Sequence, residues 1–155
     1  MISNSTSPKA KIGQNVRIGD FTIIEDNAVL GDNVVIGNFC IVRANVKIKS
    51  NVILKNYLEI RENTVIDSGC NLDSYVAISG NVKVGKNVTL RYGTVLARGT
   101  VIGDNCYPSP RVMFNNLDQA MKQIGGAKLG KNCFIGTHSD LHQGIKLGDN
   151  VTVGA

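Results

Sequence analysis

The chain has 155 residues, of which 43% are hydrophobic, 19% are charged and only 5% are aromatic, and its net charge is +5 at pH 7. This length suits one domain, and the composition is that of a globular protein with a core of small and branched aliphatic side chains. No apolar run approaches the roughly 20 residues that span a membrane, and the start of the chain lacks the pattern of a signal peptide. We therefore expect a cytoplasmic protein. The mild basic excess alone points to neither nucleic acid nor a membrane as partner.

An aliphatic side chain recurs at every sixth position from Ile12 to Ile102, and a six-residue register resumes, with a shift, from Leu129 to Val153. We call this aliphatic site position one. Position two is often Gly, position four is mostly Asn or Gly, and position five is small or branched. A period of six matches no helix, so each hexad predicts a short strand and a turn. Positions one and five point inward, and position four forms a corner, where Asn and Gly tolerate left-handed backbone conformations.

This repeat is the hexapeptide pattern of a parallel β-helix. It predicts an all-β fold and one domain over residues 1–155. The parts are an N-terminal lead-in (1–11), a main hexad array (12–114), an inserted loop (115–128) and closing coils (129–155). Within the loop, the stretch "LDQAMKQI" could form one or two helical turns. Long loops in regular folds commonly carry function. Because the core of a β-helix is enclosed, a substrate has to bind on the outer surface, where such a loop can form a wall of the site.

The four cysteines all occupy position five, the small inward site: Cys40, Cys70, Cys106 and Cys133. Their spacings of 30, 36 and 27 residues do not match those of zinc-ligand pairs. We expect four buried, reduced thiols, no disulfide and no metal site.

The hexads resemble those of the hexapeptide-repeat acyltransferase superfamily. This resemblance implies a left-handed, triangular β-helix in which three hexads form one 18-residue coil, and hence about seven coils. It also implies an acyl-CoA co-substrate and a homotrimer with sites between subunits. In such a helix the aromatic residues that follow one another at 18-residue intervals should stack along one corner, about 4.8 Å apart: Phe21, Phe39, Tyr57 and Tyr75.

Two local motifs refine the resemblance. "RVMFNNLD" is similar to the "VxFTND" stretch of nucleotide-sugar N-acetyltransferases, which implies that Arg111, Asn115 and Asn116 bind the sugar substrate. The same stretch aligns with the "NH" element of maltose- and galactoside-type O-acetyltransferases, whose His is the general base; here that residue is Asn116. "LHQGIKLGDNVTVGA" resembles the family's closing coil "ILPGVTIGDNVVVGA". Small residues of these coils lie beside the pantetheine arm in the family, which implies that acetyl-CoA contacts Gly136, Thr137, Gly154 and Ala155.

The chain has only two histidines, His138 and His142, and both follow the loop. An imidazole suits a general base at neutral pH. His138 occupies an outward corner at position four and is the first candidate, and His142, at position two, is the second. The alternative interpretation for each is a solvated corner side chain.

These observations favour acetyl transfer from acetyl-CoA to a hydroxyl or amino group of a sugar or a nucleotide-linked sugar. A γ-type carbonic anhydrase shares the fold but needs three zinc-binding histidines, and this chain has two. A non-catalytic hexapeptide-repeat scaffold or assembly subunit remains the alternative.

Overall fold

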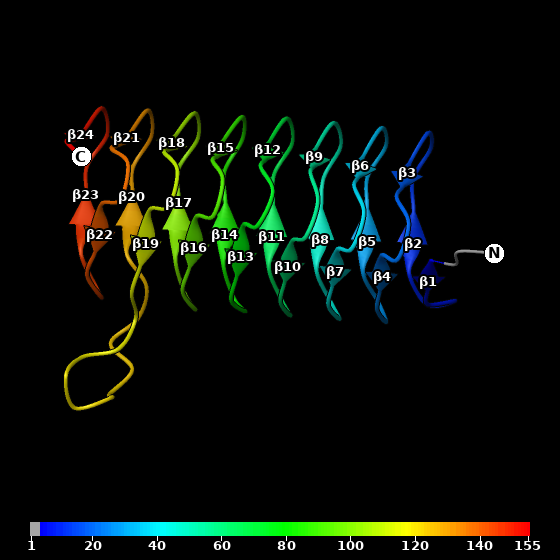
Figure 1. Ribbon diagram of the computed structural model, residues 1–155, viewed down its shortest axis with the longest axis horizontal. Coiled ribbons are helices and arrows are strands. Elements are labelled where there is room, and N and C mark those ends of the chain that lie inside the picture. The colour runs from blue at the N-terminus through cyan, green and yellow to red at the C-terminus, as the bar shows by residue number, and fades with distance from the viewer. Residues whose placement is uncertain (1–3) are drawn as a thin grey trace.

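The computed structural model describes residues 4–155 as a solenoid of 24 short parallel β-strands with a long loop hanging from its side (Figure 1). Each coil contributes one strand to each of three faces, and there are eight coils. The three faces are named here in the order in which the chain visits them.

The first face contains the strands that open each coil: β1 (Ser5–Thr6), β4 (Ile23–Ile24), β7 (Ile41–Val42), β10 (Glu59–Ile60), β13 (Ala77–Ile78), β16 (Val95–Leu96), β19 (Met113–Phe114) and β22 (Asp140–Leu141). The second face contains β2 (Lys11–Ile12), β5 (Val29–Leu30), β8 (Lys47–Ile48), β11 (Val65–Ile66), β14 (Lys83–Val84), β17 (Val101–Ile102), β20 (Lys128–Leu129) and β23 (Lys146–Leu147). The third face contains β3 (Arg17–Ile18), β6 (Val35–Ile36), β9 (Ile53–Leu54), β12 (Asn71–Leu72), β15 (Thr89–Leu90), β18 (Tyr107–Pro108), β21 (Phe134–Ile135) and β24 (Thr152–Val153).

Strand register follows the coil period. Stacked strands pair residues 18 apart, as in Ser5↔Ile23, until the loop lengthens one coil. Across the loop the paired residues are 27 apart, as in Met113↔Asp140. The solenoid therefore continues in register on both sides of the loop, which projects from the corner between the first and second faces.

Positions one and five fill the interior, as the hexads predict. Their side chains from Ile24 to Leu141 are almost entirely buried, whereas Ile12 in the first coil is 42% exposed. All four cysteines are buried and free, so their predicted burial is confirmed. Aliphatic and thiol side chains of similar size thus stack in columns along the axis, which is how a narrow prism excludes water without large aromatic residues.

The corners explain why Asn is so frequent at position four. Asn15 and Asn150 have φ values of 55° and 60°, in the left-handed region that Asn tolerates better than most residues. Asn side chains of neighbouring coils also bond to one another, as where Asn33 Nδ2 donates to Asn51 Oδ1 over 3.2 Å. Each corner therefore stabilises the next.

The predicted aromatic column is confirmed. The rings of Phe21, Phe39, Tyr57 and Tyr75 stack with centroids 4.8, 5.0 and 4.9 Å apart, and Tyr92 adds a tilted fifth ring. All five remain between 43% and 50% exposed. The column therefore forms a continuous apolar ridge along the corner between the third and first faces.

Three details of the sequence prediction are corrected. The helix has eight coils, not seven, because the lead-in 1–11 already contains β1 and the first residue of β2. The loop ends at residue 127, because Lys128 pairs with Val101 in β20. The loop contains no helical turn; instead an antiparallel bridge joins Leu117 to Gln123. Within residues 4–155, the structure has no helix long and apolar enough to cross a membrane.

Candidate functional site

The loop is a small hairpin held together by one aspartate. Asp118 Oδ1 accepts hydrogen bonds from the backbone N–H groups of Ala120 (2.9 Å) and Lys122 (2.8 Å). Met121 adopts φ 60°, which breaks the right-handed backbone that a helix would need. The Asp118 side chain and the Met121 backbone conformation thus favour a tight turn over the predicted helical turns.

Backbone hydrogen bonds fasten the base of the loop to the coil that follows. The Asn116 carbonyl oxygen accepts from the N–H of Ile124 over 2.9 Å and from that of Gly125 over 3.3 Å. The N–H of Gly144, one coil later, donates to the Gly125 carbonyl oxygen over 2.9 Å. The loop base and the corner at residues 142–144 therefore form one connected unit.

A shallow cavity of about 250 Å³ lies where the loop meets this corner. It is bounded by Asn115, Leu117, Asp118, Gln119, His142 and Gln143. Asn115 and His142 each follow a strand of the first face, and those strands, β19 and β22, are paired. The structure therefore brings a predicted substrate-binding residue and a predicted base together in one polar cavity.

Asn115 is fixed in this cavity by the neighbouring coil. Its backbone N–H donates to the Leu141 carbonyl oxygen over 2.9 Å, and its side-chain Nδ2 donates to the Asp140 carboxylate. Asp140 opens β22, and His142 is the first residue after that strand. A carboxylate, an amide and an imidazole thus gather at the loop, which is a set suited to binding hydroxyl or ammonium groups.

His138 and Arg111 lie elsewhere, on the corner between the third and first faces. The His138 backbone N–H donates to the Pro110 carbonyl oxygen over 3.2 Å, so the two residues occupy the same corner of adjacent coils. Both have left-handed backbones, with φ 60° and 58°, and both are exposed. His138 and His142 flank opposite ends of β22, and the structure does not bring them into one site.

The predicted acetyl-CoA residues lie beside His138. A Cβ added at Gly136 would stand 2.5 Å from the Ala155 nitrogen, so close stacking of the last two coils already requires glycine there. Ser139 Oγ donates to the Gly154 carbonyl oxygen over 2.9 Å, which joins the same two coils. Gly136, Thr137, Gly154 and Ala155 therefore form one edge, separate from the loop cavity.

The sequence interpretation missed Asp118, Gln119, Asp140 and Gln143. The repeat itself contains a signal for the pairing of Asn115 with His142. If the nine extra residues of the loop are left out of the count, these two residues occupy the same position in consecutive coils. The hairpin shape of the loop had no such signal, because it depends on hydrogen bonds from Asp118 that no repeat describes.

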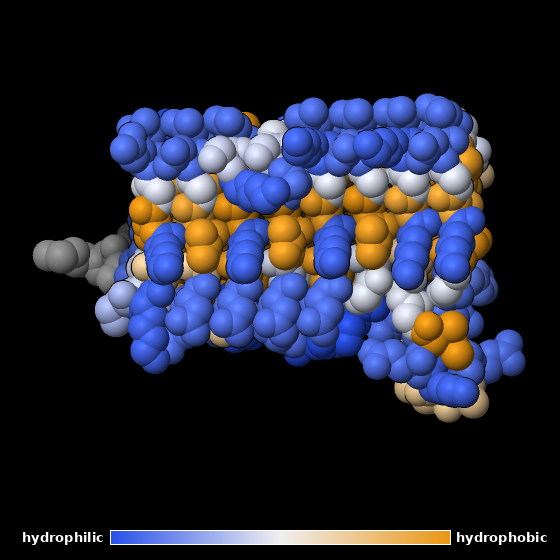
Figure 2. Space-filling model, turned by 180° about the vertical axis from the view of Figure 1, so that it is seen from behind, coloured by the Kyte–Doolittle hydropathy of each residue, from blue (hydrophilic) through white to orange (hydrophobic). Residues whose placement is uncertain are grey.

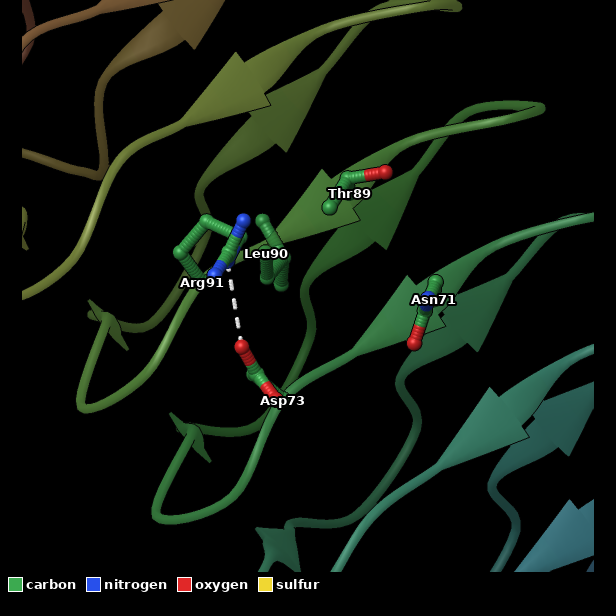
Figure 3. A pocket seen from close by; sticks show the side chains of 5 residues that line it. All are labelled: Asn71, Asp73, Thr89, Leu90 and Arg91. Atoms are coloured by element: carbon green, nitrogen blue, oxygen red, sulfur yellow. Dashed lines mark hydrogen bonds and ion pairs between the residues drawn. The ribbon is translucent and has the colours of Figure 1, made fainter.

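A second hollow of about 250 Å³ lies on the third face, between Asn71, Asp73, Thr89, Leu90 and Arg91 (Figure 3). Arg91 Nε donates to Asp73 Oδ2 over 3.1 Å, and Arg91 Nη1 donates to the Tyr107 hydroxyl over 2.6 Å. The guanidinium charge is therefore already paired, and no predicted site residue lies here. Similar pairs of opposite charge occur between other coils, such as Arg43 with Glu25 (2.8 Å) and Lys49 with Asp67 (2.8 Å).

Two of the buried thiols, Cys70 and Cys106, offer no nucleophile at neutral pH. Burial raises the pKa of Cys70 and of Cys106 to about 11, so both stay protonated. Among residues 4–155, no three His, Cys, Asp or Glu side chains are grouped so that they could hold a metal ion.

Family models match two parts of the chain. A model described as bacterial transferase hexapeptide (six repeats) matches residues 9–44 and 27–62, and one described as hexapeptide repeat of succinyl-transferase matches residues 126–155. Among curated protein sequences, none matches this chain.

Solved structures extend the likeness over nearly the whole chain. One UDP-N-acetylglucosamine acyltransferase aligns with 97% of this chain and 68% of its own, at 21% identity and a TM-score of 0.70. The O-acyltransferase for the same sugar nucleotide from Moraxella catarrhalis RH4 aligns with 90% of this chain and 60% of its own, at 18% identity and a TM-score of 0.59. The UDP-N-acetylglucosamine acyltransferase from Francisella novicida aligns with 91% of this chain and 62% of its own, at 20% identity and a TM-score of 0.59.

This chain thus spans roughly three fifths to two thirds of the length of those proteins, and at these identities the likeness establishes the fold. The parallel β-helix predicted by the hexads is confirmed, with eight coils, and it agrees with the left-handed form that the family resemblance implies. Hexapeptide models match both ends of the chain, and the solenoid is shared along nearly all of it, which leads to one conclusion: the chain is a hexapeptide-repeat protein with the fold of these acyltransferases.

Proposed function

We propose that the protein transfers an acetyl group from acetyl-CoA to a hydroxyl or amino group of a sugar or nucleotide-linked sugar. The observation that supports this most is the loop cavity, in which His142 and Asn115 face the same space as Asp118, Gln119 and Gln143. Amide and carboxylate groups can hydrogen-bond several hydroxyls of a sugar at once.

In this proposal His142 is the general base, ahead of His138, because His142 borders the cavity. The imidazole removes one proton from the acceptor hydroxyl or neutral amine as its oxygen or nitrogen attacks the thioester carbonyl. The C–S bond then breaks, and the protonated imidazole returns the proton to the departing CoA thiolate. Asn115 and Asn116 position the acceptor, since an amide is no base at neutral pH. Arg111 and the edge formed by Gly136, Thr137, Gly154 and Ala155 would contact substrates from the neighbouring corner.

We place the working site between subunits of a homotrimer. The cavity is shallow on a single chain, and the loop exposes apolar side chains around it: Met121 is 75% exposed, Ile124 48% and Leu117 39%. A neighbouring subunit that covers these side chains would deepen the cavity and exclude water from it.

Isothermal titration calorimetry with acetyl-CoA tests the proposal. Saturable binding, together with release of free CoA when sugar or nucleotide-sugar acceptors are added, is the expected result. A well-folded protein that shows no heat of binding would instead support a non-catalytic scaffold.

A further inference from the structure

The second face of the solenoid exposes a single file of lysines. Its outward side chains are, in coil order, Lys11, Val29, Lys47, Val65, Lys83, Val101, Lys128 and Lys146. All five lysines are exposed and the three valines are half-buried. Figure 2 shows hydrophilic and hydrophobic columns alternating in this way along the solenoid axis. We call these eight side chains the lysine row.

The charges of the row are free. Among residues 4–155, none of the five lysines takes part in an ion pair, although Lys9, Lys49 and Lys131 on the corners all do. No acidic residue faces outward from the strands of this face. Positive charge therefore accumulates along one line, with lysines about 10 Å apart over most of it and closer at Lys128 and Lys146.

Carboxylates border the row on both corners. On one side Asp32 and Asp149 accept backbone hydrogen bonds from Gln14 (2.8 Å) and Lys131 (2.7 Å), which fixes them at the corner. On the other side Glu62 is paired with Arg98 over 2.6 Å. The basic strip is therefore only one residue wide, and a flat anionic surface would meet these carboxylates as well as the lysines.

The narrow, linear shape of the basic strip favours some kinds of polyanion over others. Single-stranded nucleic acids are commonly held by aromatic side chains on which bases stack, and the row has none. Membrane-surface binding relies on large apolar side chains beside the basic ones, and the row offers only valine. A linear chain of anionic sugars fits better, because its charges follow one line and its C–H surfaces can lie on Val29, Val65 and Val101.

The row leads to the loop cavity. Lys128 directly follows the loop, and its backbone N–H donates to the Ile145 carbonyl oxygen over 2.8 Å. Lys128 and Lys146 are paired in register, and Lys146 lies four residues after His142. A chain that lies along the row therefore ends on the same two coils that carry the loop and the proposed base.

We infer that the lysine row binds an anionic polysaccharide, a chain of carboxylate-bearing sugars, and delivers it to the loop cavity as the acetyl acceptor. The delivery step rests on the proposed acetyl transfer, whereas binding along the row does not. The row is roughly 34 Å long at ~4.8 Å per coil, so several consecutive sugars contact it at once.

Binding of oligogalacturonates to the full chain, without acetyl-CoA, tests the inference. A chain long enough to span the row should bind at least tenfold more tightly than the disaccharide, and added salt should weaken it. The triple variant Lys11→Gln, Lys47→Gln, Lys83→Gln lies away from the cavity and should lose at least tenfold in affinity for the long chain. The matched variant Arg17→Gln, Lys55→Gln, Arg91→Gln removes the same charge from the third face and its far corner, and it should stay within about twofold of the unsubstituted protein.

Equal affinity of the two triple variants would overturn the inference. Tighter binding to vesicles of anionic lipid, to a single-stranded oligonucleotide or to polyglutamate of matched charge would overturn the assignment to a glycan. If the long glycan binds through the row but no acetyl group is transferred, acetyl transfer fails and the row stands. If small sugars are acetylated while the row variant binds the long glycan normally, the row fails and acetyl transfer stands.

Discussion

At the scale of single residues, similar sequence positions serve different purposes. Gly136 is required because a Cβ there would meet the next coil, 2.5 Å from the Ala155 nitrogen. His142 also occupies a position-two site, yet it borders a cavity beside Asn115. His138 keeps a left-handed backbone with φ 60° on an exposed corner. The distinction between His142 and His138 depends on the loop, because both side chains are exposed and only His142 borders the cavity that the loop forms.

We predict that His142→Ala lowers turnover roughly 100- to 10,000-fold, the range typical for loss of a general base. His138→Ala should change turnover much less, since His138 lies at the other end of β22. Steady-state rates of CoA release measure both. Calorimetry provides the control, because acetyl-CoA affinity should survive in each variant.

A large loss in His138→Ala alone would transfer the role of base to His138 and to the edge formed by Gly136 and Gly154. Unchanged turnover in the double variant would remove both histidines from the mechanism.

At the scale of elements, the loop is the one departure from the repeat, and its shape depends on Asp118. Two backbone N–H groups donate to one carboxylate oxygen, and the base is tied to residues 142–144. The strands on either side remain in register with the coils before and after them. We therefore expect that the loop can become more mobile while the strands of the solenoid stay paired.

We predict that Asp118→Ala loosens the loop while the solenoid stays intact. Without the carboxylate, the N–H groups of Ala120 and Lys122 lose their shared acceptor, a loss of about 1 kcal/mol per hydrogen bond. Trypsin should then cleave after the exposed Lys122 several times faster, and KM for the acceptor should rise severalfold. Limited proteolysis followed by mass spectrometry measures the cleavage.

Asp118→Asn is the matched control, because its amide oxygen keeps the acceptor and it should cleave nearly as slowly as the unsubstituted protein. Equal cleavage of all three proteins would show that Asp118 does not hold the hairpin.

At the scale of the whole molecule, the three faces differ in character. The second face has the unpaired lysines, whereas the first face exposes apolar side chains such as Ile23 (41%) and Met113 (39%) beside the aromatic column. Like charges repel, so the lysine row is poorly suited to face its own copy in a symmetric assembly. The first face and the loop are the surfaces on which we expect subunits to meet.

We predict that light scattering at micromolar concentration reports a trimer. Ile23→Lys together with Met113→Lys should weaken assembly, because burying two uncompensated charges costs several kcal/mol. Circular dichroism should stay unchanged, since both side chains point away from the core. A monomer in the unsubstituted protein would contradict both the trimer and the site between subunits.

The repeat by itself determined the solenoid. Each hexad has aliphatic residues at position one, small residues such as cysteine at position five, and Asn at the corner. This pattern shows which side chains point inward and which point outward, so the strands, their register and the core could be predicted from each hexad alone. The coil number was one too low only because Ser5–Thr6 pairs with Ile23–Ile24 without an aliphatic marker of its own.

Only the tertiary structure decided what lies outside the core. Stacking placed Asn115 beside His142, 27 residues away, and separated His142 from His138, which is only four residues away along an extended chain. It also aligned five lysines, spread from residue 11 to residue 146, into one row. The physical reason is that outward neighbours in a solenoid are set by the coil length, and a single nine-residue insertion changes that length just where the site forms.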